Sequence, residues 1–165
     1  MVIRPTLYTL SFAIKGKLSL MARPLGEEHL EEYIQGLQQL NITTVVSLLE
    51  SQEQYELGLR QQPVYCANYD LTYIHFPIPD RGLPSTPKAL ELAKQLWQRI
   101  DEGEHVVIHC RAGIGRTGII AGAVLVASGI KPPQALQLIS EARGVKVPDT
   151  DEQEAWLLNL PNYLK

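Results

Sequence analysis

Residues 109–118 read HCRAGIGRTG, between the apolar runs VVI at 106–108 and IIAGAVLV at 119–126. This order predicts a strand, a tight loop and a buried helix. Two glycines let the loop curl so that successive N–H groups face inward, and the following helix adds the positive end of its dipole. Cys110 opens the loop and Arg116 closes it. These features favour an anion, so we expect the loop to hold a phosphate and to keep the Cys110 thiol ionised.

The residue types in this loop suit nucleophilic displacement at phosphorus. Cys110 is intrinsically nucleophilic, and neighbouring donors can lower its pKa. Arg116 offers a planar fork for two phosphate oxygens, which a lysine could not reproduce. Thr117 can donate its hydroxyl to the thiolate and stabilise the same sulfur as a leaving group. The predicted substrate-binding residues are Arg111, Ala112, Gly113, Ile114, Gly115 and Arg116, with the Arg111 side chain reaching either substrate or solvent.

A second loop supplies the candidate acid. Residues 77–84 read PIPDRGLP, and three prolines with one glycine interrupt regular structure. Asp80 is the best candidate for general acid, because the leaving alcohol needs a proton and a loop carboxyl can swing in with substrate. In the second step it would act as base. A simple turn role stays open, since Pro-Asp-x-Gly is a common turn pattern. Carboxylates elsewhere are interpreted mostly as solvent-facing helix residues.

Other polar residues carry weaker signals. Gln153 can orient a water molecule through its amide, but Thr150-x-x-Gln153 is also a capping box, and both readings stay open. His75 is interpreted as an ordinary strand residue and Cys66 as a structural thiol. The two cysteines do not form a disulfide framework, and the four histidines are scattered without metal-ligand spacing. No metal and no cofactor are therefore expected.

The length of 165 residues predicts one domain, spanning 1–165, with a substantial core. A formal net charge of -3 gives no support for nucleic-acid binding through a basic field. The apolar run 118–127 is too short to cross a bilayer, and the run 7–14 lacks the features of a secretory signal. We therefore expect a monomer in the cytoplasm, where a reactive thiol would survive.

The pattern of apolar residues and turn formers divides the chain into alternating elements. A box at 51–54 is predicted to open a helix that runs to about Arg60 and is closed by Pro63. The order predicts an α/β domain with a central, mostly parallel sheet of about five strands flanked by helices, and a ligand loop at a carboxyl strand end. The predicted strands are 3–12, 17–22, 43–49, 71–78 and 105–109, and the other helices span about 25–40, 86–102, 119–128, 132–143 and 150–160.

The segment HCRAGIGRTG resembles the signature of the protein tyrosine phosphatase superfamily, His-Cys-x5-Arg-Ser/Thr. PDRGLP at 79–84 is similar to its mobile acid loop, and 147–153 to its glutamine loop. The size resembles that of the compact dual-specificity group, most of all its atypical members such as the kinase-associated phosphatase group. Ile78 stands where tyrosine-specific members carry Trp, and no segment resembles their aromatic loop. The resemblance implies a phosphatase-like fold and a metal-independent phosphomonoesterase with a phosphocysteine intermediate.

Three functions follow from these residues. The first is a phosphoprotein phosphatase whose partner is a phosphorylated protein or peptide, acting on phosphotyrosine and, more broadly, on phosphoserine or phosphothreonine. The second keeps the chemistry but takes a phosphoinositide or another non-protein phosphate ester. Some lipid-directed relatives carry additional basic residues in the loop; here Arg111 is basic but Ile114 is not. The third is a non-catalytic phosphate-binding module, against which the intact Cys110, Arg116 and Asp80 argue.

Overall fold

A computed structural model describes residues 3–13 and 15–164, so four positions of the predicted domain 1–165 lie outside the description. A five-stranded sheet of order β1-β2-β5-β3-β4 forms its centre. The strands β2, β5, β3 and β4 run parallel, and β1 pairs antiparallel with β2. The predicted mostly parallel sheet is therefore confirmed. The strands are β1 (Tyr8–Leu10), β2 (Lys17–Met21), β3 (Thr44–Ser47), β4 (Thr72–His75) and β5 (His105–His109).

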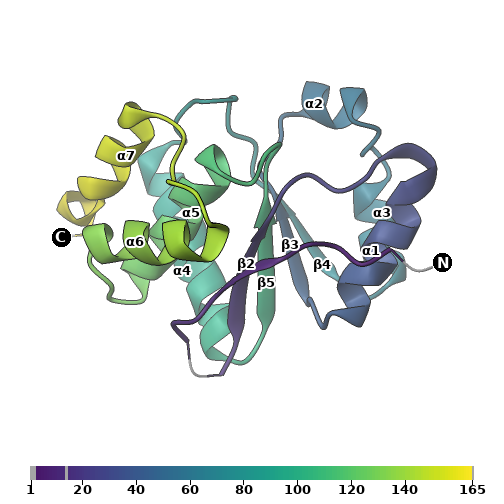
Figure 1. Ribbon diagram of the computed structural model, residues 1–165, viewed down its shortest axis with the longest axis horizontal. Helices are drawn as coiled ribbons and strands as arrows, with labels where there is room; N and C mark the ends of the chain where they lie inside the picture. The colour runs from purple at the N-terminus through teal and green to yellow at the C-terminus, as the bar shows by residue number, and fades with distance from the viewer. Residues whose placement is uncertain (1–2, 14, 165) are drawn as a thin grey trace.

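Helices cover both faces of this sheet (Figure 1). One group, drawn on the left, consists of α4 (Thr86–Asp101), α5 (Gly115–Ala127), α6 (Pro132–Arg143) and α7 (Asp151–Leu158). The other group consists of α1 (Leu30–Gln39), which follows the 3-10 helix η1 (Glu27–His29), and α3 (Gln62–Asn68). The short helix α2 (Ser51–Glu56) lies beyond the strand ends, near the top of the view. A second 3-10 helix, η2 (Leu160–Tyr163), follows α7.

Alternation along the central strand explains why the core has two halves. In β5, Val106 and Ile108 pack in the hydrophobic cluster that includes α4 and α5, while Val107 packs in the cluster that includes α1 and α3. Successive strand residues point to opposite faces, so one strand supplies both clusters. Helix α5 is buried on every side, from Arg116 to Val126. The loop between β5 and α5 is therefore held at both ends by core.

The structure corrects the prediction around α2. The capping box predicted at 51–54 is wrong by one residue: Glu50 caps the helix, and the Glu53 carboxylate accepts the Glu50 backbone N–H at 3.0 Å. The helix ends at Glu56 instead of near Arg60. Pro63 does not close this helix but stands in the first turn of α3, where its missing N–H is no loss. The helix α3 itself was not predicted.

Within the described parts of the chain, no helix combines the length and the apolar character needed to span a bilayer.

Candidate active site

The glycine-rich loop lies where β5 ends, in the middle of the sheet, as the sequence predicts. A cavity of about 230 Å³ opens above it, and six of its lining residues belong to the segment 110–116. Gly113 is not among them: it adopts a left-handed conformation (φ 76°), and a side chain there would lie 2.5 Å from the Met21 carbonyl oxygen. The remaining lining residues are Asp80, Arg81, Asp149 and Gln153.

The thiol at the base of the cavity has the neighbour that the sequence predicts. Thr117 Oγ1 donates a hydrogen bond to Cys110 Sγ at 2.9 Å, and both residues are buried. The hydroxyl comes from the first turn of α5, whose burial fixes its position. The contact suits stabilisation of a thiolate, which stays the predicted role of Thr117.

The guanidinium of Arg116 is held by a carboxylate that the sequence analysis missed. Its Nη1 donates to Glu53 Oε1 at 2.6 Å and its Nη2 to Glu53 Oε2 at 2.9 Å, a two-pronged pair. Nη1 also donates to the Ile78 carbonyl at 3.0 Å. Only 2% of the Arg116 side chain is exposed. Glu53 occupies the Nη1–Nη2 edge, which leaves the edge formed by Nε and Nη2 without a Glu53 contact.

Glu53 is buried, so it is an exception to the interpretation of most other carboxylates as solvent-facing helix residues. Burial alone would raise the pKa of its carboxyl. Hydrogen bonds from Arg116 and from the Glu50 backbone, together with the Arg116 charge, outweigh burial and hold that pKa below its usual value. Desolvation likewise acts to lower the pKa of Arg116, but the Glu53 hydrogen bond and the nearby Cys110 raise it. The pair is therefore fully charged at neutral pH.

The position of Glu53 near the site could have been suspected from the sequence, because Glu53 follows soon after β3. The carboxyl ends of parallel strands meet at one edge of the sheet, where ligands bind. The ends of β3 and β5 lie side by side, with Ser47 opposite His109. A carboxylate shortly after β3 is thus placed near the loop that follows β5.

Arg111 pairs with the same short helix. Its Nε lies 3.4 Å from Glu53 Oε2 and its Nη2 lies 3.9 Å from Glu56 Oε2. Arg111 also lines the cavity. The side chain is 46% exposed, so it can turn from Glu56 toward a bound substrate at little cost, since exposed ion pairs contribute about 0–1 kcal/mol.

The acid loop closes one side of the cavity. Asp80 Oδ1 lies 3.4 Å from Arg116 Nη2, and the Asp80 side chain is 62% exposed. Arg81, the next residue, has a left-handed backbone (φ 60°), a costly conformation for a residue other than glycine. Its guanidinium lies 3.6 Å from Asp149 Oδ2. The structure thus brings Asp80 to the Cys110–Arg116 pair, as the sequence predicts.

Gln153 holds the two outer loops together. Its Oε1 accepts the backbone N–H groups of Asp149 and Thr150, both at 3.2 Å, and its Nε2 donates to the Gly82 carbonyl at 3.3 Å. The Thr150 hydroxyl accepts the Gln153 backbone N–H, so the capping box is confirmed. Because Gln153 also lines the cavity, the capping role does not remove it from the site. Water positioning stays a prediction.

His109 supports the loop from behind as a neutral ring. Its Nδ1 lies 3.2 Å from the Cys110 carbonyl, and its Nε2 lies 3.0 Å from Gln62 Nε2. A carbonyl only accepts, so Nδ1 carries the proton and Nε2 accepts from the Gln62 amide. Burial lowers the pKa of His109 to about 4. The imidazole is therefore uncharged near pH 7.

The remaining candidates lie outside this cavity. His75 belongs to β4, and its Nε2 lies 2.7 Å from the Leu49 carbonyl. Cys66 is a free thiol in the cluster of α1 and α3, and burial raises its pKa to about 12. Among the described residues, no group of His, Cys, Asp or Glu side chains is arranged to hold a metal ion.

The family model described as "Polymorphic toxin system, DSP-PTPase phosphatase" matches residues 20–130. The chain belongs to this phosphatase family. Cyclin-dependent kinase inhibitor 3 of Rattus norvegicus is 30% identical over 91 residues, which cover 54% of this chain and 43% of the relative. An Arabidopsis thaliana protein named "Phosphatidylinositol 3,4,5-trisphosphate 3-phosphatase and protein-tyrosine-phosphatase PTEN1" is 35% identical over 98 residues, 54% of this chain and 24% of that protein. The matches thus span less than half the length of these relatives.

Solved phosphatase structures share the fold. The kinase associated phosphatase, crystallised with its catalytic-site cysteine replaced by serine, superposes with a TM-score of 0.89 at 20% identity, covering 98% of this chain and 97% of that one. The active form of Tk-PTP gives a TM-score of 0.72 at 28% identity, covering 94% and 97%. The predicted superfamily, its atypical dual-specificity group and the phosphatase-like fold are confirmed. Members of this family are hydrolases.

We predict that Glu53→Gln weakens both the fold and the site, because Arg116 then lacks its counter-charge inside the protein. Removing one partner of a buried pair costs about 3–5 kcal/mol, and a guanidinium displaced by about 1 Å can cost about 100-fold in rate. Urea unfolding and p-nitrophenyl phosphate hydrolysis measure the two effects. Glu56→Gln is the control for stability, since Glu56 is exposed and pairs only at 3.9 Å. Equal losses of stability in both variants would contradict the prediction.

We also predict that His109 makes the protein sensitive to acid. The folded state holds the pKa of His109 near 4, whereas the unfolded chain has its usual value of about 6.5. The neutral His109 ring therefore contributes fully to the free energy of unfolding above pH 6.5. This contribution decreases by about 1.4 kcal/mol per pH unit as the pH falls from 6.5 to 4. His109→Asn should flatten this part of the urea-stability profile. His29→Asn, at an exposed site, should leave it unchanged; identical profiles for all three proteins would exclude the effect.

Proposed function

We propose that this protein is a cysteine-dependent phosphomonoesterase that removes phosphate from phosphotyrosine, and from phosphoserine or phosphothreonine, in proteins. The observation that carries the proposal is the convergence of Cys110, Arg116 and Asp80 on one cavity at the carboxyl end of β5. A nucleophile, a phosphate-binding cation and an acid are the three groups that this reaction needs.

In the first step, Cys110 Sγ attacks phosphorus while the bond to the ester oxygen breaks. The loop N–H groups and the free edge of Arg116 bind the equatorial oxygens, where charge develops. Phosphate oxygens take the place beside Arg116 Nη2 that the Asp80 carboxylate occupies in this structure. Asp80, in its protonated form, is then free to give its proton to the leaving oxygen.

In the second step, water attacks the phosphocysteine and the P–S bond breaks. The Asp80 carboxylate takes a proton from the attacking water, and inorganic phosphate forms. Cys110 leaves as a thiolate, which the Thr117 hydroxyl stabilises from 2.9 Å. Gln153 can orient the water once its Nε2 turns from Gly82.

The charges around the cavity favour a substrate with one phosphate. Each arginine that lines it faces a carboxylate: Arg81 faces Asp149, and Arg111 and Arg116 both face Glu53. Few positive charges therefore remain for further phosphates. None of the described lining residues is aromatic. This supports a cavity that accepts phosphate esters without a phenyl ring. Phosphoserine and phosphothreonine are thus within its range.

A phosphoinositide is the second candidate substrate. The Arabidopsis relative carries both a phosphoinositide and a protein-tyrosine activity in its name. In this chain the exposed Arg111 could leave the weak Glu56 contact and meet a second phosphate.

We further propose that the chain acts as a single-domain monomer in a reducing compartment such as the cytoplasm, without nucleic acid as a partner. Its two free cysteines and its net negative charge support this setting.

We predict that Asp80→Asn slows alkyl phosphates far more than aryl phosphates. A threonine alkoxide needs a proton to leave, whereas p-nitrophenolate leaves without one, and general acids contribute about 10²–10⁴-fold. The measurement is kcat for a phosphothreonine peptide and for p-nitrophenyl phosphate, in wild type and variant. If both substrates slow equally, or if neither slows, Asp80 is not the general acid.

The substrate class is tested by phosphate release from phosphotyrosine peptides, phosphothreonine peptides and soluble inositol phosphates. Cys110→Ser provides the blank, because it should bind phosphate without turnover. We expect the peptides to be preferred, without added metal. A preference of about 100-fold for inositol phosphates, equivalent to about 2.7 kcal/mol, would select the second candidate. Turnover by Cys110→Ser would remove the nucleophile assignment.

A further inference from the structure

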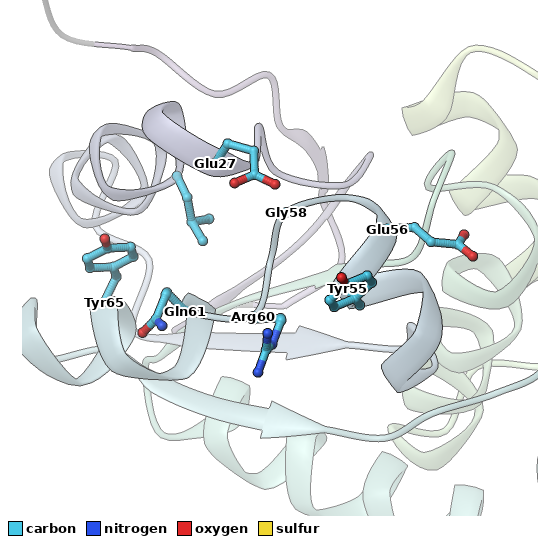
Figure 2. A pocket seen from close by; sticks show the side chains of 8 residues that line it. Glu27, Tyr55, Glu56, Gly58, Arg60, Gln61 and Tyr65 are labelled. Atoms are coloured by element: carbon cyan, nitrogen blue, oxygen red, sulfur yellow. The ribbon is translucent and has the colours of Figure 1, made fainter.

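A second cavity, of about 610 Å³, lies beside the active site and has no part in the chemistry described so far. It is bounded by η1 and the start of α1, by α2 and by α3, with residues 58–61 joining the last two. Figure 2 shows Tyr55 and Glu56 extending from α2, Tyr65 on the opposite side, Glu27 above and Arg60 below. The cavity thus combines aromatic walls with charged groups at its edge.

A backbone hydrogen bond joins the two sides of this cavity. The Glu27 N–H donates to the Gly58 carbonyl at 2.9 Å, which joins η1 to the end of α2. Glu27 has a left-handed conformation (φ 52°), a costly one that only its surroundings can maintain. Gly58 is also left-handed (φ 71°), and a side chain there would collide with the Glu27 side chain. The Glu27 backbone is therefore fixed beside the cavity, and its exposed carboxylate lies at the cavity edge.

One exposed ion pair separates the two cavities. Arg111 lines the active-site cavity and Glu56 lines the second one. Their atoms Nη2 and Oε2 are 3.9 Å apart, and the side chains are 46% and 53% exposed. Such a pair contributes about 0–1 kcal/mol and opens readily. A ligand held by its phosphate above Cys110 can therefore extend past this pair into the second cavity.

Substrate phosphate also changes the charge of the second cavity. A phosphate dianion above Cys110 attracts Arg111, and Glu56 then loses its cationic partner. The second cavity is left with two carboxylates, Glu27 and Glu56, against one guanidinium, Arg60. Arg60 already lies over the Tyr55 ring, with its Cζ 5.6 Å from the ring centre. This ring face is thus suited to a cation.

We infer that the second cavity binds a lysine or arginine side chain of the phosphorylated protein, a few residues from the phosphorylated position. This inference rests on the proposed protein-phosphatase function. The aliphatic stem of such a side chain would lie along Tyr55 and Tyr65, and its cationic end would meet Glu27 and Glu56. Arg60 is the intramolecular competitor that the incoming cation displaces.

The test uses phosphopeptides that differ only in one residue, Lys, Ala or Glu, placed in turn at two to five positions on either side of the phosphorylated residue. At the position that reaches the cavity, kcat/KM should decrease in the order Lys, Ala, Glu. The expected ratio of Lys to Glu is about 5- to 10-fold, as exposed charge pairs provide. Rates for p-nitrophenyl phosphate, which is too small to reach both cavities, serve as the reference for each protein.

Variants of opposite charge make the test specific. Glu27→Lys should reverse the order of the peptides, and Arg60→Gln should increase the preference for Lys. Glu28→Lys is the matched control, because Glu28 is the exposed neighbour of Glu27 but does not line the cavity. A purely structural role for Glu27 would slow all peptides alike and would not reverse their order.

Two outcomes would overturn the inference while leaving the proposed function in place: equal rates for the Lys and Glu peptides at every position, or the same response to Glu27→Lys and Glu28→Lys. If p-nitrophenyl phosphate is hydrolysed but no phosphopeptide is, the proposed protein-phosphatase function is wrong. The inference, which rests on that function, is then wrong as well.

Discussion

The buried ion pair between Arg116 and Glu53 is the interaction on which the site depends. Arg116 lies in the first turn of α5, a helix that is enclosed by core on all sides, so its charge requires compensation. Glu53 provides it through two hydrogen bonds of 2.6 and 2.9 Å. Glu53 also accepts the Glu50 N–H that caps α2. A helix of six residues is too short to be stable alone, so the contact that orients Arg116 also anchors α2.

The rest of the site is built around this buried pair from more exposed segments. Loops from three regions meet above Cys110: the acid loop at Asp80, the turn at Asp149 and the loop after β5. Gln153 ties the first two together through Gly82 and Asp149. The chemistry thus depends on a fixed centre, supported by His109 and α5, and on outer loops whose contacts are weaker and more exposed.

Those parts of the fold that depend on short-range residue patterns could be predicted from the sequence. The apolar run in β5 and the glycines after it placed the loop, and the expected donation from the Thr117 hydroxyl to Cys110 is present at 2.9 Å. Glu53 was missed because its partner is 63 positions away and its own neighbourhood looked like a solvated helix. Helix α3 was missed because a proline such as Pro63 can end one helix or begin another, and only tertiary packing decides between them.

The double use of Glu53 has a consequence for how the molecule fails. Most proteins lose activity and structure through separate titrations, since the groups that react are seldom those that hold the backbone. Here a single proton on one carboxylate would remove the counter-ion of Arg116 and, at the same instant, weaken the cap of α2. Because the pKa of Glu53 is held below its usual value, this protonation occurs below physiological pH. Acid would then reduce activity and stability in the same step.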